Sequence, residues 1–334
     1  MSEKKKALSS SELATLWMTY QQKTMIQRIL EYFIEKAHDE EAKEILLYTH
    51  SNVKDYIGRL IGLFENEGCV IPIGFTEEDV NIGVPKLFDH KFDIMFLRNL
   101  KATSMGLHTL HLNMSYRKDL ILLYKELTGF TQTVYEKCMD YLREKDVLPG
   151  PPAVTVPKSI EFAQSPNYMA GFNIFSDKRT LNTVEVAYLY FGIETNTLGM
   201  QMMTGFAQAA TEPEVKKYFI KGKELSKKIV SDYTHVLMQS DIHAPSTSGA
   251  KATDSTVSPF SDKLMMYCTS LFTNFGLGSN ALGTAFSLRS DLPVKLAVTA
   301  KDILAYGHEG GKIMAKNGWM EQPPSMEDRN KLFK

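Results

Sequence analysis

Apolar residues recur every three or four positions along most of this chain, which is the spacing of one face of an α-helix. Residues Ile45, Val53, Tyr56, Leu60 and Phe64 form one such series. No stretch alternates apolar and polar residues over a useful length, as a half-buried strand would. The pattern therefore predicts an all-α protein with helices at about 11–38, 40–67, 87–114, 117–146, 183–210, 212–240, 259–286 and 289–317.

The second half of the chain repeats the first. The stretch GLHTLHLNMSYRKDL at 106–120 resembles GSNALGTAFSLRSDL at 278–292. Matching residues lie 172 positions apart here and 173 positions apart nearer the start of each half, which indicates one residue of difference in an intervening loop. The matching pairs include Glu12 and Glu185, Ala37 and Ala210, Lys54 and Lys227, Phe88 and Phe260, Arg117 and Arg289, and Asp119 and Asp291. Each half is therefore predicted to be the same four-helix unit.

Loop lengths predict how the helices of each unit are connected. Short turns join the first helix to the second and the third to the fourth, so each of these pairs is antiparallel. About twenty residues join the second helix to the third, at 68–86 and again at 241–259. Such a loop reaches about 60 Å and can return along the whole bundle, as in ferritin-like folds. The prediction is two tandem ferritin-like four-helix bundles, 1–148 and 183–334, with a proline-rich linker at 149–182.

Composition narrows the classes of function. The chain has 334 residues and a formal net charge of −1, which argues against a nucleic-acid surface built on bulk charge. Cys69, Cys138 and Cys268 form no CxxC motif and favour a reducing compartment. No apolar core follows the basic start MSEKKKALSSSE, and eighteen uncharged apolar residues never run together. We therefore expect a cytoplasmic protein without a signal peptide or a transmembrane segment.

Several motifs resemble a known family. They are IPIGFTEEDVN, PKLFDHKF, NMSYRKDL, GFAQAA, PFSDKLMMY and GWMEQPP. Together they make the chain similar to a family of uncharacterised double-bundle proteins from Bacillus and related Firmicutes, and the likeness covers nearly the whole chain. The resemblance implies a ferritin-like fold, a relation to spore-coat-F-like proteins and a sporulation or stress role, with spore association. It implies no activity, because the family carries none that could be assigned to residues here.

A ferritin-like bundle raises the question of a metal site. A di-iron centre needs one Glu from each of two helices and a Glu-x-x-His from each of the other two. Only one Glu-x-x-His occurs, Glu35–His38, at the end of the first helix, so a standard di-iron oxidase is disfavoured. His108 and His111 lie one turn apart in the middle of the third helix, where both side chains share a face. They are the candidate ligands for iron or another divalent metal.

The same two histidines have a structural interpretation. When the helices are aligned by height along the bundle, Tyr124 lies near His108. The two histidines could therefore pack at a helix interface and form hydrogen bonds with tyrosine or the backbone. Their counterparts in the second unit are Asn280 and Gly283, which confines either kind of site to the first bundle. Both interpretations predict histidines that point into the first bundle, toward its first or second helix.

Two other predictions concern the crossover and the bundle ends. Apolar residues of the first crossover should lie on a helix pair, so Phe75 and Val80 should be at least partly buried. The start of the first helix, the end of the third and the start of the fourth should meet at one end of each bundle and hold an arginine-centred cluster. The predicted ion pairs are Arg117 with Glu12 or Asp119, and Arg289 with Glu185 or Asp291.

The leading interpretation is a non-catalytic structural or interaction protein that self-associates through its bundle faces. The competing hypothesis is a bundle that binds a metal or a small ligand, with oxidoreductase activity as its strongest form. Metal content separates the two classes, because near-stoichiometric Fe, Mn or Zn would favour the second.

Overall fold

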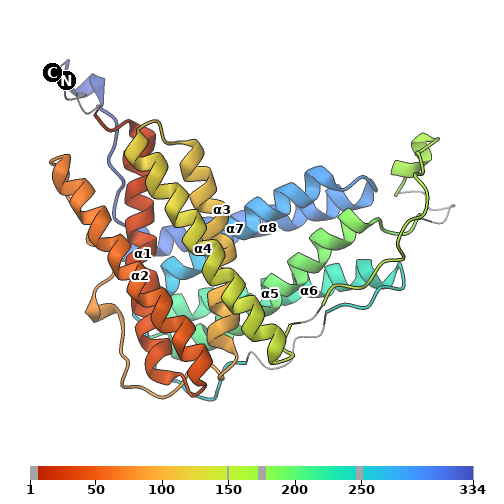
Figure 1. Ribbon diagram of the computed structural model, residues 1–334, viewed down its shortest axis with the longest axis horizontal. Helices are drawn as coiled ribbons and strands as arrows, with labels where there is room; N and C mark the ends of the chain where they lie inside the picture. Colours follow the sequence, from red (N-terminus) through yellow and green to blue (C-terminus); the bar gives the residue numbers. More distant parts are fainter. Residues whose placement is uncertain (1–6, 149, 172–177, 246–250, 334) are drawn as a thin grey trace.

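Figure 1 shows the computed structural model, which describes residues 7–148, 150–171, 178–245 and 251–333. The long helices are α1 (Ser10–Lys36), α2 (Glu40–Asn66), α3 (Phe92–Asn113), α4 (Lys118–Glu144), α5 (Thr183–Ala209), α6 (Pro213–Met238), α7 (Asp262–Phe286) and α8 (Asp291–Lys316); short 3₁₀ turns are η1 (Glu77–Asp79), η2 (Pro166–Met169) and η3 (Arg329–Lys331). Across these ranges the only β pairing is two isolated bridges. The prediction of two four-helix units is confirmed.

Side-chain caps explain where several helices begin. Ser9 and Glu12 form a capping box at the start of α1, and Asn182 and Glu185 form the equivalent box at the start of α5. Asp39 accepts a hydrogen bond from the Ala42 N–H at the start of α2. Each cap satisfies backbone N–H groups that have no partner inside the helix. These three helices accordingly begin within one residue of the predicted positions.

Helix α3 begins at Phe92, five residues later than predicted. Residues 87–89 are not helical because they pair with the crossover of the other bundle, and a turn at 90–91 follows them. The Leu87 carbonyl accepts from the Thr253 N–H at 2.9 Å, and the Asp89 N–H donates to the Lys251 carbonyl at 2.9 Å. Helical periodicity in the sequence does not reveal this competing tertiary pairing, so the predicted start was wrong.

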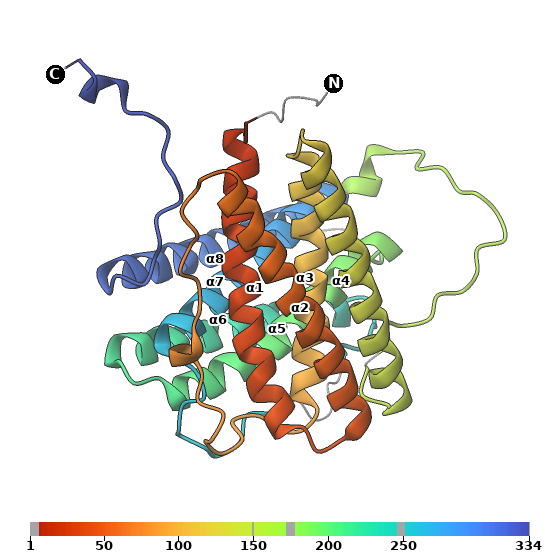
Figure 2. The same ribbon diagram turned by 60° about the vertical axis from the view of Figure 1, so that its left-hand side comes forward.

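The connection between α2 and α3 returns along the first bundle, as its length predicted (Figure 2). Phe75 is buried and Val80 is half-buried in this crossover, which confirms the prediction for both residues. The Phe75 N–H donates to Thr24 Oγ1 of α1 at 3.2 Å. Gly74 precedes it with φ of +66°, and a Cβ at that position would lie 2.4 Å from Thr24 Oγ1. Only glycine therefore allows the crossover to approach α1 so closely.

The two bundles cross one another, and their crossovers join them (Figures 1 and 2). Val80 bridges Phe260, and the Ser261 hydroxyl donates to Asp79 Oδ1 at 2.6 Å. The Phe260 ring packs edge-on against Phe206 of α5 in the second bundle and against Tyr32 of α1 in the first. Buried side chains of both bundles thus form one continuous hydrophobic cluster.

The linker between the bundles lies largely away from them. Residues 151–169 are exposed, and this stretch arcs outward in Figure 2. Its apolar side chains are exposed too, with 77% of Val156, 85% of Ile160 and 81% of Phe162 accessible. Part of the predicted linker, 149 and 172–177, lies outside the described residues. Among the described helices, none is both long and apolar enough to cross a membrane.

Candidate functional site

The centre of the first bundle contains a buried layer of amines and histidine. Helix α1 contributes Lys23, α3 contributes Lys101 and His108, and α4 contributes Thr131. All four side chains are completely inaccessible to solvent. Lysine is almost never fully buried unless it is paired, so this layer is the least ordinary part of the core.

Hydrogen bonds fix the tautomer of His108. The Thr131 hydroxyl donates to the Leu127 carbonyl at 2.7 Å, so it accepts at its 3.1 Å contact with His108 Nδ1. The proton of the imidazole is therefore on Nδ1. Its other nitrogen, Nε2, lies 3.2 Å from Lys23 Nζ and accepts a hydrogen bond from that amine. Both ring nitrogens are thus already used by groups of the protein.

His111 lies one turn further along α3 and is also buried. Its Nδ1 is 3.2 Å from Thr19 Oγ1, which in turn is 3.3 Å from the Tyr124 hydroxyl. The ring of Tyr124 packs edge-on against that of His111. The prediction that both histidines point inward toward α1 is confirmed. The predicted neighbour was misplaced by one turn, since Tyr124 lies beside His111 and Lys23 lies beside His108.

Lys101 has no hydrogen-bond partner at Nζ among the described residues. Its ammonium lies 4.9 Å from the centre of the Phe130 ring, which supplies a weak cation–π contact. Such a contact is worth about 0.5–2 kcal/mol, less than the usual cost of burying a charge without a hydrogen bond. Lys101 is therefore a destabilising group held by its surroundings.

Burial determines the protonation states of the layer. Burial, aided by repulsion from Lys101, holds the pKa of Lys23 well below its usual range. Burial lowers the pKa of Lys101 to about 8. Burial, together with the charge of Lys23, lowers the pKa of His111 to about 4 and holds that of His108 far below its ordinary value. At neutral pH both histidines are neutral, and Lys101 carries its proton.

The donor groups of this layer do not suit a divalent metal. No group of three or more His, Cys, Asp or Glu side chains in the described part of the chain is placed to hold a metal ion. His108 is hydrogen-bonded to an amine where a bundle metal centre would have a carboxylate. Glu35 and His38 are both exposed at the end of the first bundle. A metal at His108 and His111 stays a prediction, and the contacts found around them do not favour it.

The second bundle has different residues at the positions that correspond to this buried layer. At the repeat offset, Lys23 corresponds to Asn196, Lys101 to Thr273, His108 to Asn280 and Thr131 to Ile303. These four counterparts line a cavity of about 110 Å³ inside the second bundle. The two bundles therefore differ at their centres, where helical bundles usually have a cofactor or ligand site. Amines fill the centre of the first bundle, and a cavity occupies the centre of the second.

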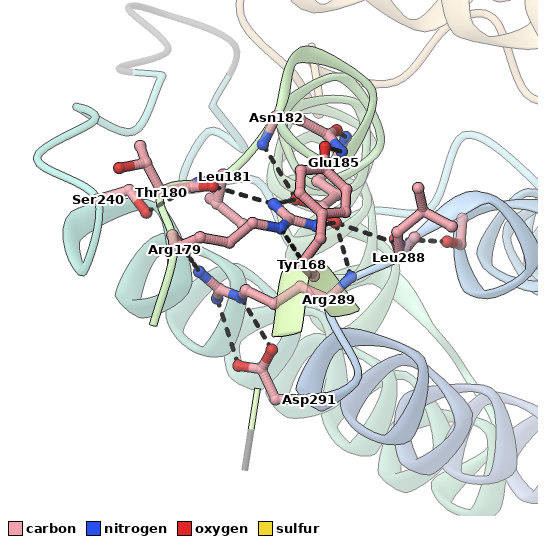
Figure 3. A network of polar contacts seen from close by, with 12 residues as sticks. Tyr168, Arg179, Thr180, Leu181, Asn182, Glu185, Ser240, Leu288, Arg289 and Asp291 are labelled. Atoms are coloured by element: carbon pink, nitrogen blue, oxygen red, sulfur yellow. Dashed lines mark hydrogen bonds and ion pairs between the residues drawn. The ribbon is translucent and has the colours of Figure 1, made fainter. Parts of the chain in front are cut away.

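The ends of the bundles hold the predicted arginine clusters. Figure 3 shows the second, where Arg289 is almost completely buried. Its Nε donates to Asp291 Oδ1 at 2.9 Å, and its Nη1 donates to the Arg179 carbonyl at 3.0 Å. Glu185 accepts the Arg289 backbone N–H at 2.9 Å and pairs with the Arg179 guanidinium at 2.6 Å. The predicted ion pair with Asp291 is confirmed, and Glu185 contacts the backbone of Arg289.

The first bundle repeats this arrangement. Arg117 donates to Asp119 at 2.6 Å and to Glu67 at 2.9 Å, while its backbone N–H donates to Glu12 at 2.7 Å. Burial alone would raise the pKa of Glu12, but hydrogen bonds from Ser9 and from the backbone after α3 outweigh it and lower that pKa to about 2. The glutamate that recurs in both units, Glu12 or Glu185, therefore joins the start of one helix to the turn between two others.

One family matches both halves of the chain. Residues 1–160 and 169–332 match the family described as "Protein of unknown function (DUF3231)". The chain belongs to this family. The two matches coincide with the two bundles, so the family's unit is one four-helix bundle with its crossover.

No curated protein matches the chain. Among solved structures, the chain is similar to a protein from Bacillus halodurans C-125 described as a "putative spore coat protein". The identity is 16% and the TM-score is 0.42, over 45% of this chain and 98% of that one.

Proposed function

We propose that the protein is a non-catalytic interaction protein built from two joined helical bundles. The observation that carries this proposal is the centre of the first bundle. Lys23, Lys101 and His108 lie there fully buried, and within the described chain none of their side-chain hydrogen bonds goes to a carboxylate. The protonated amine of Lys101 repels a divalent cation, and side chains without solvent access offer a substrate no route. The layer accordingly supports a structural role over an oxidoreductase.

The exposed linker supports the interaction part of the proposal. Val156, Ile160 and Phe162 are each more than three-quarters accessible in a segment that contacts neither bundle along most of its length. Exposing large apolar side chains on an extended segment forgoes about 1.5–3 kcal/mol each that burial would supply. A second copy of the chain is the partner we propose, and its contact would recover this free energy.

A sporulation role belongs to the proposal through the sequence resemblance alone. The motifs of the chain resemble Bacillus and Firmicutes proteins related to spore-coat-F-like proteins. Membership of the DUF3231 family supports the repeated bundle and carries no activity. The ferritin-like assignment likewise rests on the long crossover in each unit, which is the topology of that class of bundle.

Metal analysis tests the non-catalytic part. The protein is purified without a histidine tag and without added metal, and Fe, Mn and Zn are measured by mass spectrometry. We expect less than about 0.1 metal ion per chain, because the His108 lone pair is occupied by Lys23. Near-stoichiometric metal that a His108→Gln, His111→Gln double variant loses would overturn the proposal in favour of a metal-binding bundle.

Light scattering after size-exclusion chromatography tests self-association. We expect a molar mass above that of one 37.7 kDa chain, falling toward one chain when Val156, Ile160 and Phe162 are changed to serine. The matched control changes Met326 and Phe333, which are 79% and 83% accessible at the C-terminal end, to serine as well. A monomeric wild type, or an equal effect of both variants, would contradict self-association through the linker.

A further inference from the structure

The cavity of the second bundle has the character of a binding site. It lies among α5, α6, α7 and α8, and Phe96 and Asn99 of α3 reach it from the first bundle. Most of its wall is apolar, with Leu198, Met202 and Phe272 among the lining side chains. None of the described residues that line it is Asp, Glu, Lys, Arg or His. A charged molecule would lose its hydration there without a compensating partner.

Small residues at specific repeat positions create the space. Three positions that hold Lys23, Val53 and Ser104 in the first bundle hold Asn196, Ser226 and Gly276 in the second. Each of these three replacements is smaller, and each lines the cavity. The hollow is therefore built by substitutions from α5, α6 and α7 together. A packed core normally avoids such a void, because lost contacts destabilise it by about 24 cal/mol for each Å³.

One polar atom at the cavity lacks a partner. Asn280 is 91% buried, its Nδ2 donates to the Tyr233 hydroxyl at 2.5 Å, and its Oδ1 has no hydrogen-bond partner among the described residues. A buried carbonyl oxygen left unpaired costs about 1–3 kcal/mol. Neighbouring atoms cover this oxygen, so the Asn280 amide has to turn toward the cavity before a ligand N–H or O–H group removes that cost.

The volume sets the size of the ligand. A cavity of about 150 Å³ lined by apolar side chains can hold benzene. The space here is about 110 Å³, so it suits a molecule of about the size of a single six-membered ring. A few ordered waters would also fit, but the mostly apolar wall offers them few partners beyond Asn280.

We propose that the second bundle binds a small uncharged molecule, apolar apart from one hydrogen-bond donor that meets Asn280 Oδ1. Phenols and short branched alcohols have this chemistry. The proposal goes beyond the interaction function and is independent of it, because it concerns the other bundle and needs neither self-association nor the absence of metal.

Ligand-observed NMR tests the site with three probes of one ring size: phenol, toluene and benzoate. We expect saturable binding of phenol at millimolar or lower concentration, weaker binding of toluene because it has no donor, and none of benzoate because it is charged. Asn280→Leu should remove the preference for phenol over toluene. Absence of saturable phenol binding, or equal binding of benzoate, would overturn the proposal.

Filling the cavity provides the matched control. Gly276→Leu adds a side chain where a Cβ meets no atom within 4 Å and where the residue lines the cavity, so phenol affinity should fall at least 10-fold. Gly278→Leu lies two residues away on the same helix, is exposed and also meets nothing, so affinity should not change. If Gly276→Leu does not fold, Ser226→Val restores the residue type of the first bundle and serves instead. Equal phenol affinity in the filled and control variants would contradict the assigned site.

Discussion

Replacing Lys101 by methionine should stabilise the protein at neutral pH. Methionine matches the length of the lysine stem and carries no charge, so it keeps the packing and removes the ammonium. Lys101 is fully buried, and its Nζ has no hydrogen-bond partner among the described residues. The substitution therefore removes an unfavourable group from the folded state and leaves the unfolded state almost unchanged.

The size of the stabilisation by Lys101→Met follows from the pKa of Lys101. Burial lowers the pKa of Lys101 from 10.5 to about 8, and each unit is worth about 1.4 kcal/mol. Below pH 8 the amine is charged in both states, and burying that charge costs about 3 kcal/mol. Between pH 8 and pH 10.5 the unfolded chain binds more protons than the folded chain, so wild-type stability rises with pH. The advantage of methionine should thus be about 1–3 kcal/mol at pH 7 and under about 1 kcal/mol at pH 10.

Urea unfolding followed by circular dichroism at pH 7 and pH 10 measures both values. Lys137→Met is the matched control, because Lys137 is an exposed lysine of α4 that lies 5.3 Å from the ring of Tyr48. That variant should change the free energy of unfolding by less than about 0.5 kcal/mol at either pH. A Lys101→Met protein that is less stable at pH 7, or whose gain persists unchanged at pH 10, would refute the reasoning.

Two further predictions use pairs of variants. Arg289→Met should cost about 1–3 kcal/mol in urea melts, because it takes two hydrogen bonds from the buried Asp291 carboxylate and leaves it paired with Lys178 alone, and Lys178→Met should cost less, because Lys178 is 37% exposed; equal costs would contradict this account. Gly74→Ala should lower the free energy of unfolding more than Gly68→Ala in the same assay. Both glycines have φ of +66°, but only at Gly74 would the added Cβ lie 2.4 Å from an atom of a neighbouring side chain. A smaller loss of stability for Gly74→Ala would show that the crossover can move.

The helices and their order could be predicted from sequence because each helix carries its own apolar stripe. The internal repeat also allowed the arginine clusters to be predicted, because Glu12 and Arg117 recur as Glu185 and Arg289 and so indicate the end of each bundle. The crossing of the two bundles was not predictable, since the pairing of Val80 with Phe260 joins loops that have no periodic pattern of their own.

The buried lysines were missed for a different reason. Lysine usually marks an exposed face, so Lys23 was not assigned to the core. A signal was nevertheless present, because Lys23 continues the buried series Leu16, Thr19 and Ile26 at helical spacing. A lysine within such a stripe is better read as a buried amine. The cavity left no comparable signal, because glycine and serine at a helix interface usually indicate close packing.

The central claim is that the first bundle is built around buried amines, and NMR titration of the lysine side chains tests it most directly. With lysines labelled at Cε and Nζ, we expect one resonance, from Lys23, that titrates well below the exposed lysines, and another, from Lys101, that titrates near pH 8. Lys101→Met should abolish the second resonance and raise the pKa of the first, because Lys101 repels the charge of Lys23. If every lysine of the folded protein titrated above pH 10, the buried layer would not exist and the account would fail.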